Sequence, residues 1–243
     1  MAQSKTSRSS RSRSSRRSRR RNQNTALIAG VIGGAAFLLV AVVLITMATS
    51  PTDTTVSTEF DDLPQSVDTS FGDAPGFALG EPNAPVTVVK YTDFSCGACG
   101  NLHAALKSVI STYAPRGDVK FVFKVLSFIN PPTSIPAATA AICAGQQGLF
   151  YQGQDAIWAR SQVAGTAGYT PNGLRSAISN VEGLDVDEYD SCFASAETEA
   201  LVNALVEEAL SMDVRSTPTI FVNGQQVRGD VNSIITAIEA ELP

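Results

Sequence analysis

Residues 86–113 read VTVVKYTDFSCGACGNLHAALKSVISTY, and this stretch predicts a strand followed directly by a helix. Its beginning, Val86–Tyr91, is rich in β-branched residues and suits a buried strand. Apolar residues then recur every three or four positions, as on one face of a helix: Cys99, Leu102, Leu106, Val109, Ile110 and Tyr113. The motif Cys96-Gly97-Ala98-Cys99 therefore lies where the predicted helix begins.

Two cysteines at this spacing, at the start of a helix, favour a redox pair over a structural bridge. The free backbone amides and the dipole of a helix N-terminus favour negative charge, so Cys96 is expected to react as a thiolate. Cys99 lies one turn inside the helix on its buried face, and is predicted to be the resolving thiol that meets only the mixed disulfide of Cys96. Gly97 and Ala98 supply neither charge nor proton.

Three other roles for the motif are less well supported. A purely structural disulfide gains little stability from so short a loop. A zinc site needs two further ligands, and Cys143 and Cys192 stand alone at long spacing. Soft thiolates suit Cu(I), but neither Met nor His flanks the pair. We therefore predict no metal and no cofactor, and retain a Cu(I) metallochaperone as the alternative from another functional class.

Two further features bear on the predicted site. His103 is the single histidine of the chain, and it follows Cys96 by two helical turns, about 10 Å, so a structural role is expected. Thr217-Pro218 precedes a predicted strand, where proline is unusual. A cis bond would explain this proline, but the trans form is commoner, and the residues alone leave both open.

The remainder of the folded part predicts an α/β sheet interrupted by helices. A turn at residues 80–85 precedes the first strand, and a second strand is expected over Val119–Leu126. Helical character follows over about 130–212, with connections expected at Asn172-Gly173 and at the acidic run Asp185–Asp190. The chain ends with a strand at Thr219–Val222, a hairpin turn at Asn223-Gly224, a paired strand, and a helix capped by Asp230.

The N-terminal segments differ sharply from this domain. Residues 1–24 hold nine of the 18 Lys and Arg residues and no acid, and are expected to be a disordered tail. Residues 25–49 are uncharged and long enough for one transmembrane helix, although a cleaved signal peptide with a Thr46-Met47-Ala48 site is the competing interpretation. The basic tail predicts a cytoplasmic N-terminus and an extracytoplasmic remainder. Residues 50–75, with six acids and no base, are expected to be an extended linker.

Charge also bears on partners. The tail is predicted to attract anionic lipid headgroups. Residues 76–243 carry 17 acidic and nine basic residues, a net charge of 9 − 17 = −8, which argues against nucleic acid as a partner.

Cys143 and Cys192 complete the set of four cysteines, which allows three pairings. If Cys96 pairs with Cys99, the remaining two are left to form a structural disulfide across the helical region. The alternative is that they exchange electrons with the motif, although nothing near either residue indicates a reactive thiol.

The motif after a strand, together with Thr217-Pro218 before a hairpin and a terminal helix, resembles the thioredoxin fold. The helical insertion is similar to that of the DsbA branch, and residues 80–94, GEPNAPVTVVKYTDF, resemble the start of DsbA-like domains of membrane-anchored actinobacterial type. The resemblance covers about 80–243. It implies Cys96 as nucleophile, Cys99 as resolving cysteine, Pro218 as a cis proline facing the pair, the Thr217 backbone as a contact for substrate peptide, and a second disulfide in the helical block.

The chain departs from that family at two places. Many DsbA relatives carry a histidine between the two cysteines, where this chain has Gly97 and Ala98. A buried acid often lies six residues before the first cysteine, and here that residue is Lys90.

The resemblance implies a membrane-anchored, extracytoplasmic thiol:disulfide oxidoreductase. We expect an oxidase that introduces disulfides into reduced secreted or cell-envelope proteins. A quinone-linked membrane protein, similar to DsbB or to vitamin K epoxide reductase, would reoxidise it. A reductase or isomerase is the alternative within the same class, and a redox-inert binding module is a further one.

Overall fold

The computed structural model describes residues 58–243. The predicted basic tail, the transmembrane helix and the first part of the linker lie outside these residues. Across residues 58–243, no helix combines the length and the apolar character needed to cross a membrane.

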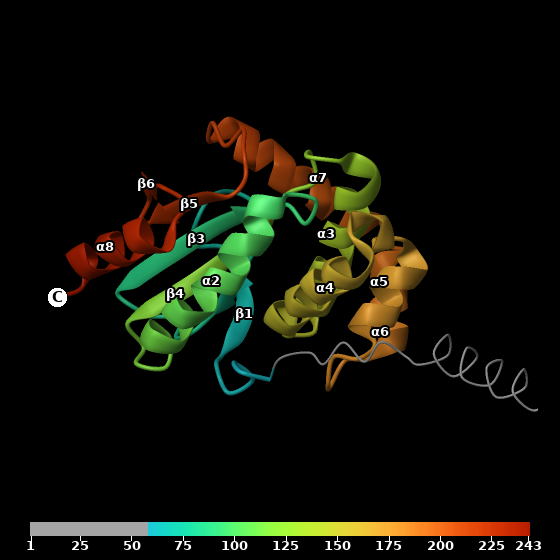
Figure 1. The fold of residues 1–243 in the computed structure, drawn as a ribbon, viewed down its shortest axis with the longest axis horizontal. Helices are drawn as coiled ribbons and strands as arrows, with labels where there is room; N and C mark the ends of the chain where they lie inside the picture. The colour runs from blue at the N-terminus through green and yellow to red at the C-terminus, as the bar shows by residue number, and fades with distance from the viewer. Residues whose placement is uncertain (1–57) are drawn as a thin grey trace, which may run out of the picture. The chain divides into compact units, whose positions relative to one another are not determined.

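Within residues 58–243, six strands form one sheet in the order β1-β2-β4-β3-β5-β6 (Figure 1). Only β3 and β4 pair in parallel, and the other neighbours are antiparallel. The strands are β1 (Gln65–Asp68), β2 (Gly76–Leu79), β3 (Val86–Thr92), β4 (Val119–Val125), β5 (Thr219–Val222) and β6 (Gln225–Val227). The helices are α2 (Gly97–Tyr113), α3 (Pro131–Gln146), α4 (Phe150–Ala164), the short 3₁₀ helix η1 (Thr166–Gly168), α5 (Pro171–Ile178), α6 (Val186–Phe193), α7 (Ala196–Ser211) and α8 (Val231–Glu241).

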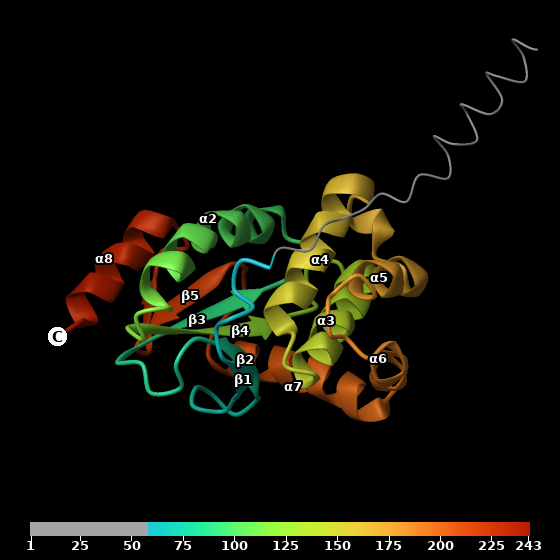
Figure 2. The ribbon, with the colours of Figure 1, turned by 90° about the horizontal axis from the view of Figure 1, so that it is seen from below.

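The helices lie in three places around the sheet (Figure 2). Helices α2 and α8 cover one face, and α7 packs on the other face against β4. Helices α3 to α6 gather beside the sheet, between β4 and α7 in the chain. The predicted α/β sheet with a helical insertion is therefore confirmed, and it places the start of α2 next to the insertion.

The elements around the motif follow the sequence pattern closely. The predicted strands correspond to β3, β4 and β5, and every apolar position expected on the face of α2 is buried. Asn223 and Gly224 both have positive φ, as the hairpin turn requires. Asp230 accepts a hydrogen bond from Ser233 N–H at 2.9 Å and caps α8, as predicted.

The structure differs from the predicted linker after residue 57. Strand β1 lies inside the range 50–75, and Phe60 is buried against Tyr151 with ring centroids 5.0 Å apart. Asp68, one of the six acids of the predicted linker, forms a buried ion pair with Lys120 at 2.7 Å. The sequence of this short strand shows no alternation of apolar and polar residues. The strand is held in place by its pairing with β2 and by the Asp68–Lys120 ion pair.

Two segments predicted as connections are helices instead. Asn172-Gly173 lies inside α5, which Thr170 caps and Pro171 begins. Residues 186–190 of the acidic run form the start of α6, where the side chain of Asp185 accepts from the N–H groups of Asp187 and Glu188. Acidic residues are favoured in the first turn of a helix, so the run marks a helix start.

A fully buried ion pair joins β4 to α7. Lys124 Nζ donates to both carboxylate oxygens of Glu208 at 2.7 and 2.9 Å, and to the carbonyls of Phe71 and Ala74. Glu208 also accepts from Tyr91 O–H at 2.6 Å. The charges on both partners are thus satisfied inside the core, which is the condition for a stable buried pair.

A disulfide between Cys143 on α3 and Cys192 on α6 crosses the insertion. Both sulfurs come from the helical block, as the resemblance implied.

Replacing Cys143 and Cys192 together with alanine is expected to lower the free energy of unfolding by about 4 kcal/mol, because the cross-link closes a loop of 49 residues in the unfolded chain. Urea unfolding measures this loss. The folded double variant should keep its thiol exchange. If the variant stays folded but exchange is lost, the two cysteines take part in electron transfer.

Candidate active site

Cys96 is the residue that caps α2, and its sulfur is accessible. Its backbone is extended, with φ −91° and ψ 109°, and its side chain makes no capping hydrogen bond to the helix. Cys96 is partly exposed, and Gly97 and Ala98 beside it are exposed. The sulfur therefore lies at the positive end of the α2 dipole, open to a second protein chain.

A buried carboxylate holds the loop before the motif. Asp93 accepts hydrogen bonds from Ser95 N–H at 2.8 Å, Ile129 N–H at 3.0 Å and Ser134 O–H at 2.6 Å. Its backbone carbonyl accepts from Cys96 N–H at 3.0 Å. Asp93 thus ties the start of α2 to the start of α3 and fixes the direction in which Cys96 leaves the sheet.

Cys99 lies beneath Cys96 and is fully buried. Burial raises the pKa of its thiol to about 11. Cys99 is therefore a protonated thiol at neutral pH and is shielded from a second chain.

Thr217 lies against Cys96, in the loop that continues through Pro218 into β5. The Thr217–Pro218 peptide bond is cis. The thiol of Cys96 donates to the carbonyl of Thr217 at 3.2 Å, across 121 residues of sequence. The four residues singled out from the sequence, Cys96, Cys99, Thr217 and Pro218, are thus brought to one place.

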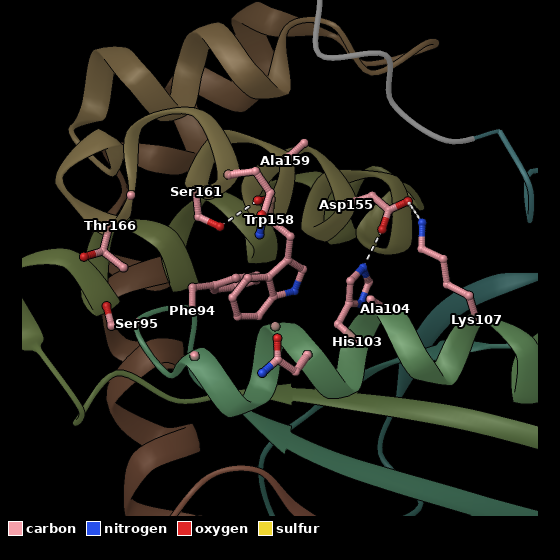
Figure 3. A pocket seen from close by; sticks show the side chains of 15 residues that line it. Phe94, Ser95, His103, Ala104, Lys107, Asp155, Trp158, Ala159, Ser161 and Thr166 are labelled. Carbon is pink, nitrogen blue, oxygen red and sulfur yellow. Dashed lines mark hydrogen bonds and ion pairs between the residues drawn. The ribbon is translucent and has the colours of Figure 1, made fainter. Parts of the chain in front are cut away.

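A groove of about 720 Å³ opens beside the motif, between α2 and α4. Figure 3 shows His103 pointing from α2 towards Asp155 on α4, with Lys107 reaching the same carboxylate. Burial lowers the pKa of His103 to about 4, so the neutral ring donates its Nε2–H to Asp155. His103 is buried, and this pairing supports the structural role expected from its spacing.

Trp158 of α4 lines the middle of this groove, between Ser95 and Lys107 (Figure 3). A Cβ atom added at Gly100 would lie 3.2 Å from the indole, so glycine allows α2 and α4 to approach closely. The indole also packs on Phe94, with ring centroids 4.9 Å apart. Trp158 therefore packs the helical insertion against the first turn of α2.

Sequence reasoning missed Asp93 and Trp158. Asp93 carried a usable signal, because an Asp two residues before Ser95 can accept the N–H of that residue in a local turn. A glycine inside a helix, such as Gly100, also signals close packing, although it does not identify the partner. The pairing of Trp158 with Gly100 depends on the tertiary fold.

Comparisons with known proteins agree with this geometry. The model of a family described as thioredoxin matches residues 73–239. The Na(+)/H(+) antiporter NhaA 1 of Mycolicibacterium gilvum is 30% identical over 166 residues, which are 66% of this chain but 26% of the antiporter. The chain thus spans about a quarter of the length of that relative.

Two other proteins resemble the chain over most of their length. The probable disulfide bond formation protein D of Bacillus anthracis is 27% identical over 174 residues, 68% of this chain and 77% of that protein. The crystal structure of oxidised BdbD from Bacillus subtilis superposes with a TM-score of 0.61 at 23% identity, covering 68% of this chain and 91% of BdbD. The fold is therefore a thioredoxin fold with a DsbA-like helical insertion.

Proposed function

Because the chain belongs to the thioredoxin family, whose model matches residues 73–239, we propose that it is a thiol:disulfide oxidoreductase acting through Cys96 and Cys99. The observation that carries the proposal is the pairing of an accessible sulfur at a helix N-terminus with a buried sulfur one turn further along. This asymmetry gives the two cysteines different tasks: Cys96 meets the substrate, and Cys99 meets only Cys96.

The exchange runs in two steps. A substrate thiolate attacks Cys96 Sγ of the oxidised pair, a substrate–Cys96 disulfide forms, and Cys99 leaves with the electron pair. A second substrate thiolate then attacks the substrate sulfur of the mixed disulfide, and Cys96 leaves as a thiolate. The substrate gains a disulfide, and the Cys96–Cys99 pair is left reduced.

Thr217 and Pro218 form the surface on which the substrate lies. Both are partly exposed, and the carbonyl of Thr217 already accepts from Cys96. An extended substrate segment that pairs with the Thr217 backbone brings its own sulfur next to Cys96. This arrangement favours substrates that present an accessible extended segment, as unfolded chains do.

The favoured direction is oxidation of the substrate. The α2 N-terminus beside Cys96 favours negative charge on its sulfur, and hence the reduced form of the pair. A pair whose reduced form is stabilised is a strong oxidant. The Cys143–Cys192 disulfide supports a working place outside the reducing cytoplasm.

The proposed setting is the outer side of a cell membrane. Residues 25–49 would anchor the chain, with the basic residues 1–24 on anionic lipid headgroups in the cytoplasm. Reduced secreted or cell-envelope proteins are the proposed substrates. A quinone-linked membrane protein of the DsbB or vitamin K epoxide reductase kind would restore the Cys96–Cys99 disulfide.

Stoichiometric oxidation of a reduced protein tests this function. The oxidised full-length protein is mixed with a reduced, unfolded two-cysteine protein without other oxidants, and free thiols are counted over time. One substrate disulfide should form for each Cys96–Cys99 pair consumed, and the Cys143→Ala/Cys192→Ala variant should give the same yield. If no substrate thiols are lost, or if the protein instead reduces a disulfide substrate spontaneously, the oxidase assignment is wrong.

A further inference from the structure

Helix α2 carries small residues on the side that faces α4. Gly97, Gly100 and Ala104, three and four positions apart, line the groove between the two helices. A Cβ atom added at Gly97 would meet nothing within 4 Å, so the groove is open at the residue that follows Cys96. Its volume of about 720 Å³ is typical of protein clefts that enclose a bound molecule.

This α2–α4 groove begins beside the reactive sulfur and is separate from the surface formed by Thr217 and Pro218. Ser95 and Gly97, the two neighbours of Cys96 in the chain, both line the groove, and both are at least partly exposed. Thr217 and Pro218 are not among its lining residues. A substrate whose sulfur is joined to Cys96 therefore has a path into the groove in addition to its contact with the Thr217 backbone.

Aromatic side chains give the groove an apolar wall. Trp158 packs on Phe94 with ring centroids 4.9 Å apart, and stacks on the ring of His103 at 6.0 Å. Figure 3 shows the indole lying across the space between the two helices. Trp158 is 7% exposed, and its Nε1–H has no hydrogen-bond acceptor in the described part of the chain. A buried indole N–H usually has a partner, so the wall combines apolar area with one unpaired donor.

Charge in the groove is balanced. Among the described residues that line it, Lys107 and Asp155 are the charged ones, and they form an ion pair at 2.7 Å. His103 has a pKa of about 4 because it is buried, so its ring is neutral at pH 7. The groove is thus a neutral site on a domain with 17 acidic and nine basic residues. It suits an uncharged segment, because a charged one would lose hydration there without gaining a counter-charge.

The length of the groove limits how much chain it can hold. Gly97 and Lys107 are the first and last residues of α2 that line it, and the ten residues between them span about 15 Å of helix. An extended peptide advances about 3.3 Å per residue, so about four residues fit along this length. Side chains of an extended segment point alternately to opposite sides, so one or two of the four can face Trp158.

We propose that the α2–α4 groove binds an uncharged, extended segment of about four residues next to the reacting cysteine of the substrate, with a large apolar side chain against Trp158. This inference rests on the proposed function and names its substrate class. The groove takes no part in the exchange, because the substrate sulfur still attacks Cys96 and Cys99 still leaves with the electron pair. Binding in it lowers the half-saturating substrate concentration and leaves the rate at saturation unchanged.

The test uses the oxidised full-length protein and short reduced peptides that contain one cysteine and no tryptophan. A Phe lies two residues before the cysteine in one peptide and two residues after it in a second, and the reference peptides carry Ser or Asp at these places. An excess of peptide opens the Cys96–Cys99 disulfide, and the rate is measured against peptide concentration. A cysteine-free form of each Phe peptide binds without reacting. Trp158 is the single tryptophan of the chain, so its fluorescence reports this binding.

Two neighbouring alanines on α2 provide a matched pair of variants. Ala104→Phe places a ring in the groove, whereas Ala105→Phe adds the same ring at the next position, which is exposed and does not line the groove. Both positions lie inside α2 and leave the cysteine motif unchanged. Dithiothreitol carries no peptide segment, so its reaction with the Cys96–Cys99 disulfide is the reference for the exchange itself.

One of the two Phe peptides should reach its half-maximal rate at a concentration at least about 10-fold lower than its Ser counterpart, because burial of a large apolar side chain provides at least this gain. The Asp peptide should bind no better than the Ser peptide. Ala104→Phe should abolish the preference, Ala105→Phe should keep it, and both should react with dithiothreitol as the wild type does. The cysteine-free Phe peptide should change the Trp158 fluorescence of wild type and of Ala105→Phe, but not that of Ala104→Phe.

Equal half-saturating concentrations for the Phe, Ser and Asp peptides overturn the proposal, as does a preference for Phe that survives in Ala104→Phe. Wild-type Trp158 fluorescence that does not respond to the cysteine-free Phe peptide also overturns it, and this measurement needs no variant to fold. Fluorescence that depends on protein concentration without peptide would instead assign the groove to a second copy of the chain. If dithiothreitol opens the disulfide and no peptide does, the proposed function fails.

Discussion

Cys96→Ser is expected to lose disulfide exchange by at least about 1,000-fold, whereas Cys99→Ser should accumulate mixed disulfides with its substrates. A serine hydroxyl does not ionise at neutral pH and forms no disulfide, so without Cys96 the accessible sulfur at the start of α2 is gone. Without Cys99, Cys96 can still attack a substrate disulfide, but no neighbouring thiol then attacks Cys96 Sγ to release the substrate, so the mixed disulfide persists. Oxidation of a two-cysteine peptide measures the first effect, and non-reducing gels of cells expressing Cys99→Ser measure the second.

The Cys96→Ser variant is also a control for the trapping experiment, because its remaining thiol, Cys99, is buried. Cys99 is 0% exposed, so the Cys96→Ser variant should trap no substrate through Cys99 although that thiol remains. The Cys96→Ser/Cys99→Ser double variant should show neither exchange nor trapping. Mixed disulfides carried by Cys99 in the Cys96→Ser variant would contradict the assignment of the two roles.

Lys124→Met should lower the free energy of unfolding by about 4 kcal/mol, because it leaves the Glu208 carboxylate buried without its counter-charge. This is a large part of the 5–15 kcal/mol that typically holds a domain folded. The carboxylate keeps hydrogen bonds from Tyr91 O–H and Ala74 N–H, but both come from neutral groups. Urea unfolding at pH 7 measures the loss.

Two variants make this measurement specific. Lys124→Met/Glu208→Leu removes both charges and should recover most of the lost stability, because apolar pairs often replace buried ion pairs without cost. Arg175→Met breaks the exposed pair with Asp190 and should cost at most about 1 kcal/mol. A Lys124→Met loss as small as that of Arg175→Met would show that the buried pair does not hold β4 to α7.

Local patterns predicted the centre of the molecule well. The β-branched run gave β3, the spacing of apolar residues gave the buried face of α2, and Asn223-Gly224 gave the hairpin between β5 and β6. The motif at the start of α2 followed from these two neighbouring elements. Each of these predictions depends on residues a few positions apart, where the backbone leaves few choices.

The rest of the site depends on contacts between distant residues. Thr217 meets Cys96 across 121 residues, and Asp155 meets His103 across 52. The sequence of β3 alone does not show which side chains face which side of the sheet, because a strand buried on both faces shows no alternation of apolar and polar residues. The strand β1 was missed for a related reason, since its pairing with β2 and the Asp68–Lys120 ion pair hold it rather than its own pattern.

The reduction potential of the Cys96–Cys99 pair, measured on the full-length protein by equilibration with glutathione, tests the central claim most directly. The α2 N-terminus beside Cys96 favours negative charge on its sulfur and so stabilises the reduced pair. The account therefore predicts a potential above about −200 mV, towards the value of about −120 mV found for a strong disulfide donor. A potential below about −200 mV, towards the −270 mV or so of a reductant, would contradict it.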